Sequence, residues 1–85
     1  MRKLSELPNI GKVTEKLLME NGIETPEDLY MAGSKEAFLK IRQIDSTACI
    51  RMLYGLEGAV QGIRWHNLPK ERKEELKEFL HLRRI

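Results

Sequence analysis

The chain has 85 residues, of which 41% are hydrophobic and 33% charged, and its net charge is only +2. This length suits a single domain, residues 1–85, with one modest core, and the net charge is weaker than a dedicated high-affinity DNA-binding domain usually carries. Because no apolar run approaches the ~20 residues that span a membrane, no secretory signal is recognisable and the single Cys49 cannot form an internal disulfide, we expect a cytoplasmic protein with no membrane association.

The first long predicted element is a helix over residues 11–21, preceded by a short helical turn at residues 4–6. Asn21-Gly22 ends the helix, since either residue suits the left-handed position past a helix end. The helix follows Leu7-Pro8-Asn9-Ile10-Gly11, in which a Pro-Asn pair leads through one apolar residue to glycine. This pattern is typical of a helix-hairpin-helix element. The apolar side of the helix consists of Val13, Leu17 and Leu18.

Gly11 gives this element two interpretations. Glycine lacks a Cβ and tolerates positive φ, so it either makes a tight turn between packed helices or lets another surface approach the backbone. In the second case the unpaired N–H groups that begin the helix would bind phosphate, with Asn9 in the loop and Lys12 and Lys16 adding charge. Such contacts would be independent of nucleic-acid sequence and sensitive to salt.

Two short helices are predicted next, over residues 25–33 and 34–42. The first begins at Thr25, a favourable N-cap residue followed by proline and two acidic residues, and it ends at Gly33. The second begins at the cap Ser34. Its apolar side consists of Phe38, Leu39 and Ile41.

A central helix is predicted over residues 45–62, capped by Asp45 or Ser46. Its apolar residues recur at the spacing of one helical face, and we expect Cys49 among them to be a buried structural thiol. The full set is Cys49, Met52, Leu53, Leu56, Ala59, Val60 and Ile63.

Small residues on the central helix predict a close neighbour. Gly55, Ala59 and Gly62 share one side, and a glycine inside a helix costs roughly 1 kcal/mol relative to alanine. We therefore expect another helix to approach closely there, either within the domain or from a partner chain.

The last predicted helix covers residues 69–83, and its apolar side consists of Leu76, Phe79 and Leu80. Residues 64–85 carry seven basic and four acidic side chains, a net charge of +3. Lys70, Arg72 and Lys73 lie near the positive end of the helix dipole, which is unfavourable, so they form a second candidate contact for an anion. Trp65 either covers the edge of the core or anchors a partner.

One motif identifies a resemblance. The segment Leu53-x-x-Leu56-Glu57-Gly58-Ala59-x-x-Gly62-x-x-Trp65, together with residues 7–11, 17–23 and 25–38 and with Leu68, resembles the C-terminal domain of the TfoX/Sxy family of competence regulators. The resemblance covers nearly the whole chain. It implies an all-α fold of the helix-hairpin-helix or sterile-alpha-motif-like kind. With the five helices predicted above, we expect a small five-helix bundle. The resemblance also implies a link to DNA uptake, where full-length members act as transcriptional co-activators. Those members have an additional N-terminal domain, so we expect a stand-alone domain here.

The sequence favours a non-enzymatic regulatory module. It contains no nucleophile–base set, metal-ligand cluster, Walker-type phosphate loop or dinucleotide fingerprint, so we expect no catalysis, cofactor, metal or small-molecule substrate. The leading hypothesis is a module that binds the nucleic-acid backbone in the regulation of transcription or DNA uptake. The alternative is an adaptor that docks a transcription-related protein through Trp65 and the glycines of the central helix.

Overall fold

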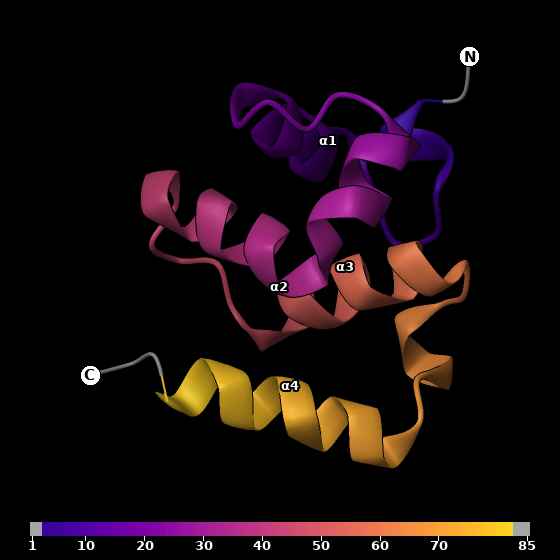
Figure 1. The fold of residues 1–85 in the computed structure, drawn as a ribbon, viewed down its shortest axis with the longest axis vertical. Helices are drawn as coiled ribbons and strands as arrows, with labels where there is room; N and C mark the ends of the chain where they lie inside the picture. The colour runs from indigo at the N-terminus through magenta and orange to yellow at the C-terminus, as the bar shows by residue number, and fades with distance from the viewer. Residues whose placement is uncertain (1–2, 83–85) are drawn as a thin grey trace.

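The computed structural model describes residues 3–82, which are all-helical as predicted. The elements are the 3₁₀ helix η1 (Leu4–Glu6), the α-helices α1 (Lys12–Glu20), α2 (Pro26–Ile44) and α3 (Ile50–Gln61), the 3₁₀ helix η2 (Trp65–Asn67) and α4 (Lys70–Leu82). In Figure 1, α1 and α4 lie at opposite ends of the molecule, with α2 and α3 between them. The most extensive contact joins α2 to α3, while α1 packs on α2 and α4 packs on α3.

A single apolar core holds these elements together. Every α-helix contributes to it, and η1 and the loops add further side chains. The largest fully buried apolar side chains are Phe38, Leu4, Leu18, Leu29, Ile41, Leu53, Leu56, Leu76 and Pro26. Most of these positions follow the predicted apolar spacing, because burying one face of each helix is the dominant favourable term in folding.

The helix count differs from the prediction. Four α-helices are present in residues 3–82 rather than five, because the predicted helices 25–33 and 34–42 are joined in the single element α2. The boundary predicted between them is nevertheless confirmed as a break in the helix at Gly33. Gly33 interrupts α2 with φ 83° and ψ 163°, a conformation open in practice only to glycine. Figure 1 shows that α2 changes direction part-way along its length. The element before the 7–11 loop is only the three-residue η1, so a helix-hairpin-helix motif is not confirmed.

The central helix α3 begins at Ile50, several residues later than predicted. The Asp45 carboxylate accepts hydrogen bonds from the backbone N–H and the hydroxyl of Thr47, and Ala48 N–H donates to the Asp45 carbonyl. Asp45 therefore builds a turn instead of a helix cap, since its side chain offers the backbone an alternative to the helix.

Two predicted core positions are wrong. Cys49 is the N-cap of α3 and is exposed, because the later start of the helix removes it from the apolar face. Val13 lies in the first turn of α1 and is 74% exposed. The last predicted helix ends at Leu82 in the described structure, and its predicted end at Arg83 lies outside the described residues.

Candidate nucleic-acid interface

The 7–11 loop is held by apolar anchors and one unusual backbone conformation. Leu7 and Ile10 are buried, and Ile10 N–H donates to the Leu7 carbonyl at 3.3 Å. Between them, Asn9 has φ 69°, the left-handed region that asparagine tolerates better than most residues. Gly11 itself has an extended conformation, with φ −94° and ψ −176°. The positive φ in this loop therefore lies at Asn9 and not at the glycine.

The Asn9 side chain connects the loop to α3 and to the segment that follows it. Its Nδ2 donates to the carbonyl oxygens of Ile63 at 2.9 Å and of Gly55 at 3.3 Å. Its Oδ1 accepts from the backbone N–H of Trp65 at 3.2 Å. Three side-chain hydrogen bonds thus tie the 7–11 loop to the middle of α3, to the segment just after α3 and to η2. Both polar atoms of the Asn9 side chain are hydrogen-bonded within the protein. A contact between Asn9 and nucleic acid stays a prediction, and it would have to be made by the backbone of Asn9.

The close approach predicted for the glycines of α3 involves a loop rather than another helix. A Cβ at Gly58 would lie 2.5 Å from Asn9 Nδ2 and 2.6 Å from the Ile63 carbonyl oxygen, distances that real Cβ atoms do not reach. At Gly55 the nearest atom would be Asn9 Cβ at 3.5 Å, an ordinary contact. Gly62 has no close neighbour and ends α3 in the left-handed conformation.

Gly11 differs from Gly58 because the fold leaves space around it. It is the exposed N-cap of α1, and a Cβ there would meet no atom within 4 Å. Serine, threonine, asparagine and aspartate cap a helix at least as well as glycine, so capping does not require glycine. The first N–H groups of α1, at Lys12, Val13 and Thr14, have no acceptor within the helix.

Gly11 opens onto a groove of about 580 Å³ between the 7–11 loop and the start of α3. We call this the Gly11 groove. Arg51 from α3 and Arg64 from the segment before η2 line it, together with the carboxylate of Asp45. Hydrogen bonds from the hydroxyl and then the backbone N–H of Thr47 lower the pKa of Asp45, so this carboxylate stays ionised. The sequence interpretation missed both arginines, since they come together only in the tertiary structure.

Lys12 and Lys16 are both exposed on α1. Within residues 3–82 neither of them forms an ion pair. Their charges are therefore available at the surface that carries Gly11, and their contact with phosphate stays a prediction.

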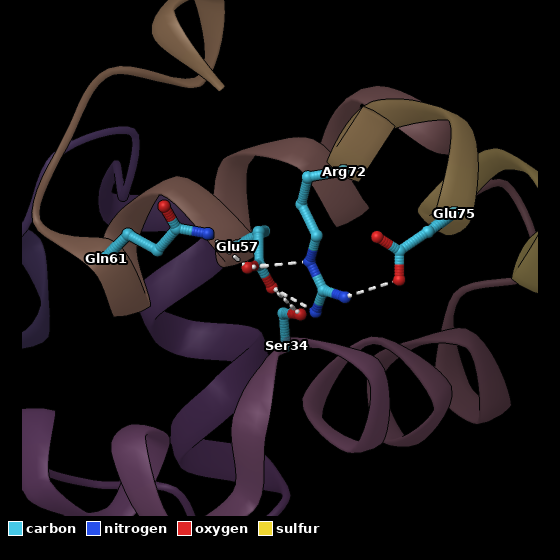
Figure 2. A network of polar contacts seen from close by, with 5 residues as sticks. All are labelled: Ser34, Glu57, Gln61, Arg72 and Glu75. Atoms are coloured by element: carbon cyan, nitrogen blue, oxygen red, sulfur yellow. Dashed lines mark hydrogen bonds and ion pairs between the residues drawn. The ribbon is translucent and has the colours of Figure 1, made fainter. Parts of the chain in front are cut away.

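The three basic residues of the second predicted contact, at the start of α4, have different surroundings. Lys70 is exposed. Lys73 is half-buried, and its Nζ lies 5.5 Å from the centre of the Trp65 ring and 3.4 Å from the His66 carbonyl oxygen. Arg72 points into the fold, as Figure 2 shows. The three residues adjoin in sequence, but their side chains do not form one basic patch.

Arg72 belongs to a polar network around the buried Glu57 (Figure 2). Its Nε and Nη2 donate to the two carboxylate oxygens of Glu57 at 3.0 and 3.1 Å, and its Nη1 lies 3.4 Å from Glu75. The paired, planar geometry is the strong form of an arginine–carboxylate contact. The hydrogen bond with Glu57 raises the pKa of Arg72. Little of this guanidinium remains for a phosphate, and the contact of Arg72 with nucleic acid stays a prediction.

Glu57 receives two further hydrogen bonds. Ser34 Oγ, just after the Gly33 break in α2, donates at 2.6 Å, and Gln61 donates from one turn along α3. Burial by itself opposes ionisation of Glu57, but the hydrogen bonds from Arg72, Ser34 and Gln61 outweigh it and lower the pKa of Glu57. The network therefore holds an ionised carboxylate where α2, α3 and α4 meet.

Trp65 packs as part of an aromatic stack. Its ring lies 5.7 Å from Tyr54 with an interplanar angle of 20°, and 4.0 Å from His66 with an angle of 28°. The side chain is half-buried. This packing favours the interpretation that Trp65 covers the edge of the core, while its role as a partner anchor stays a prediction.

The described residues contain neither a candidate metal site nor a membrane-spanning helix. Residues 3–82 hold no group of three or more histidine, cysteine, aspartate or glutamate side chains placed to bind a metal ion. None of the described helices combines the length and apolar character needed to cross a membrane.

Residues 1–80 match the TfoX C-terminal domain. The chain belongs to the TfoX C-terminal domain family. It is 38% identical over 77 residues to Protein Sxy of Escherichia coli (strain K12), and the match covers 91% of this chain and 37% of Sxy. The chain thus spans little more than a third of that relative. The family resemblance predicted from the sequence is confirmed.

Two crystal structures from Listeria monocytogenes have the same fold as this TfoX C-terminal domain. The first, of an uncharacterized protein in triclinic form, has a TM-score of 0.91 and 60% identity and covers 92% of this chain and 89% of its own. The second, of a protein of unknown function in tetragonal form, has a TM-score of 0.87 and 62% identity and covers 89% of this chain and 93% of its own.

The structure explains the motif that marks the family resemblance. Leu56 and Ala59 are fully buried in the core. Glu57 holds the polar network, and Gly58 lets Asn9 approach the helix. Each of the four residues in Leu56-Glu57-Gly58-Ala59 thus has a structural role in this TfoX C-terminal domain.

Proposed function

We propose that this domain is a regulatory module that binds the phosphate backbone of nucleic acid at the Gly11 groove. Gly11 carries the proposal. It is an exposed glycine that the fold does not require, because its φ is ordinary and a Cβ would meet open space. A close approach by a ligand is the remaining physical reason for a residue without a side chain at this position.

Charge around the groove supports an anionic ligand. Arg51 and Arg64 line it against the one carboxylate of Asp45, and Lys12 is exposed on the adjoining first turn of α1. The unpaired N–H groups at the start of α1 add the positive end of a helix dipole. These groups recognise phosphate rather than base edges, so binding would be independent of sequence and would serve the regulation of transcription or DNA uptake.

The alternative function is docking of a transcription-related protein. Two exposed apolar side chains favour it, Met31 on α2 at 89% and Val13 on α1 at 74%. Neither is needed for the core. Salt separates the two functions, because contacts with phosphate weaken as salt rises while apolar docking changes little.

The test is fluorescence anisotropy of a labelled random-sequence duplex. If two or three phosphates are contacted, a threefold rise in salt should weaken binding by roughly one order of magnitude. Gly11→Val should abolish duplex binding, because the valine side chain would block the close approach of phosphate to the backbone. Gly11→Ala should weaken binding less, because alanine is smaller. Both variants suit the extended backbone of Gly11, so both should fold.

Charge variants sharpen this test. Lys12→Glu and Arg64→Gln should each weaken binding several-fold. Lys40→Glu, on α2 and outside the groove lining, is the control for Lys12→Glu and should bind the duplex with an affinity close to that of the parent. Absence of binding at low salt, or equal loss in Lys40→Glu, would reject the Gly11 groove as the binding site and direct the search to protein partners.

A further inference from the structure

A second cavity, of about 520 Å³, lies beside the start of α3. It shares only Thr47, Ala48 and Cys49 with the Gly11 groove. We call it the Arg42 cavity. Three nitrogen-bearing side chains line it, Arg42 from the end of α2 and Lys77 and His81 from α4, and no acidic side chain lies in its described lining. The cavity is therefore a concentration of positive and donor groups without a counter-charge.

Arg42 supplies an independent sign of a missing partner. Its Nη1 is buried and has no hydrogen-bond partner in the described structure. The guanidinium also forms no ion pair within residues 3–82. A buried cationic nitrogen without a partner is costly, and buried charges are normally paired. Arg72, the other arginine that enters the interior, satisfies this rule through Glu57.

We propose that the Arg42 cavity binds a phosphate-type oxyanion. The guanidinium of Arg42 presents paired donors that match the oxygens of phosphate, Lys77 adds a point charge, and the ring of His81 can donate a hydrogen bond. The hydroxyls of Ser46 and Thr47 also line the cavity. The oxyanion would supply the partner that Arg42 Nη1 lacks. It would belong either to a free phosphorylated small molecule or to a nucleic acid, and the site is separate from the proposed function at the Gly11 groove.

The first measurement is the dissociation constant of inorganic phosphate, obtained from amide shifts in residues 46–50 against sodium chloride of equal ionic strength. Arg42→Met should weaken phosphate binding by about tenfold or more, because a hydrogen bond to a charged group is lost. Lys77→Met, at an exposed position, should weaken it several-fold and keeps the test valid if Arg42→Met fails to fold. Arg51→Met, which removes the same charge from the Gly11 groove, is the matched control.

The proposal predicts a second signature in stability. Arg42→Met should lose the rise in Tm that phosphate gives the parent protein, since only a ligand of the folded state stabilises it. Its Tm in chloride should equal or exceed that of the parent, because the unpaired buried charge is gone. A parent protein that shows no phosphate-specific shift would overturn the proposal. So would equal loss in Arg51→Met, because that result would place the phosphate in the Gly11 groove.

Competition identifies the source of the oxyanion. A short duplex that displaces phosphate from the parent and from Gly11→Val would show that nucleic acid reaches the Arg42 cavity. A duplex that leaves phosphate bound would indicate a free phosphorylated ligand. Because Gly11→Val alters only the groove of the proposed function, normal phosphate binding in this variant keeps the failure of one proposal distinct from the failure of the other.

Discussion

At the scale of single residues, Asn9 organises the candidate interface. Its side chain joins segments 46 to 56 residues apart in sequence. The backbone of α3 can approach it only because Gly58 has no side chain. Asn9 is therefore explained by its structural contacts, whereas the fold gives no structural reason for a glycine at position 11. Two residues of the same loop motif, Asn9 and Gly11, thus have different physical explanations.

Replacement of Gly58 tests this arrangement. Gly58→Ala should lower the free energy of unfolding by about 1–3 kcal/mol, because the Cβ must displace Asn9 or the backbone at Ile63. Gly55→Ala is the matched control on the same helix and should be neutral or stabilising by up to about 1 kcal/mol, since its Cβ meets only an ordinary contact. Urea denaturation measures both. Equal stability of the two variants would contradict the close contact.

At the scale of elements, the break in α2 sets the direction of two helical segments. Gly33 lies between the turn capped by Thr25 and the segment that carries Ser34 and Phe38 into the core. The break positions Ser34 to donate to Glu57. A continuous helix over the same residues would turn these side chains through a different angle, because each residue rotates by about 100° along a regular helix.

Gly33→Ala should therefore destabilise the protein by about 1–3 kcal/mol, since the conformation at φ 83° and ψ 163° is strained for alanine. Space is not the cause, because no atom lies within 4 Å of the added Cβ. Gly11→Ala, at ordinary φ, should cost only about 0.5 kcal/mol. Thermal unfolding of the two variants checks the difference, and a Gly33→Ala protein as stable as the parent would refute the strain.

At the scale of the whole molecule, the Glu57 network joins α2, α3 and α4, as Figure 2 shows. Since the folded state lowers the pKa of Glu57, this group stabilises the fold above the pKa that it has in the unfolded chain. The stabilisation is lost as pH falls through the folded pKa. The free energy of unfolding should therefore decrease as pH falls below about 5.

Glu57→Gln isolates this contribution. The variant should be less stable by about 1–3 kcal/mol at neutral pH, because Arg72 loses its charged partner while 30% of its side chain remains open to water. Its stability should change less with pH in the acidic range. Glu75→Gln, at the exposed partner of Arg72, should keep the pH dependence of the parent. Parallel pH profiles for Glu57→Gln and the parent would exclude this role.

The sequence by itself determined the all-helical fold, the family and the part of the core that lies on the predicted helix faces. Local signals are sufficient there, because Thr25 with Pro26 starts a helix, Gly62 ends one, and apolar spacing selects the buried face. The predicted helix start at Asp45 was wrong, because the aspartate carboxylate can accept hydrogen bonds in a turn as well as at the start of a helix. That ambiguity moved the start of α3 and exposed Cys49.

Only the tertiary structure decided which charged side chains are paired within the fold and which line a groove. Arg72 and Lys73 are neighbours in sequence, but Arg72 is paired with Glu57 from another helix. Arg51 and Arg64 are distant in sequence, yet they line one groove with Gly11. The physical reason is that charge pairing and cavity lining depend on separations of a few ångströms. Such separations follow from how the helices pack, which the spacing along one helix does not specify.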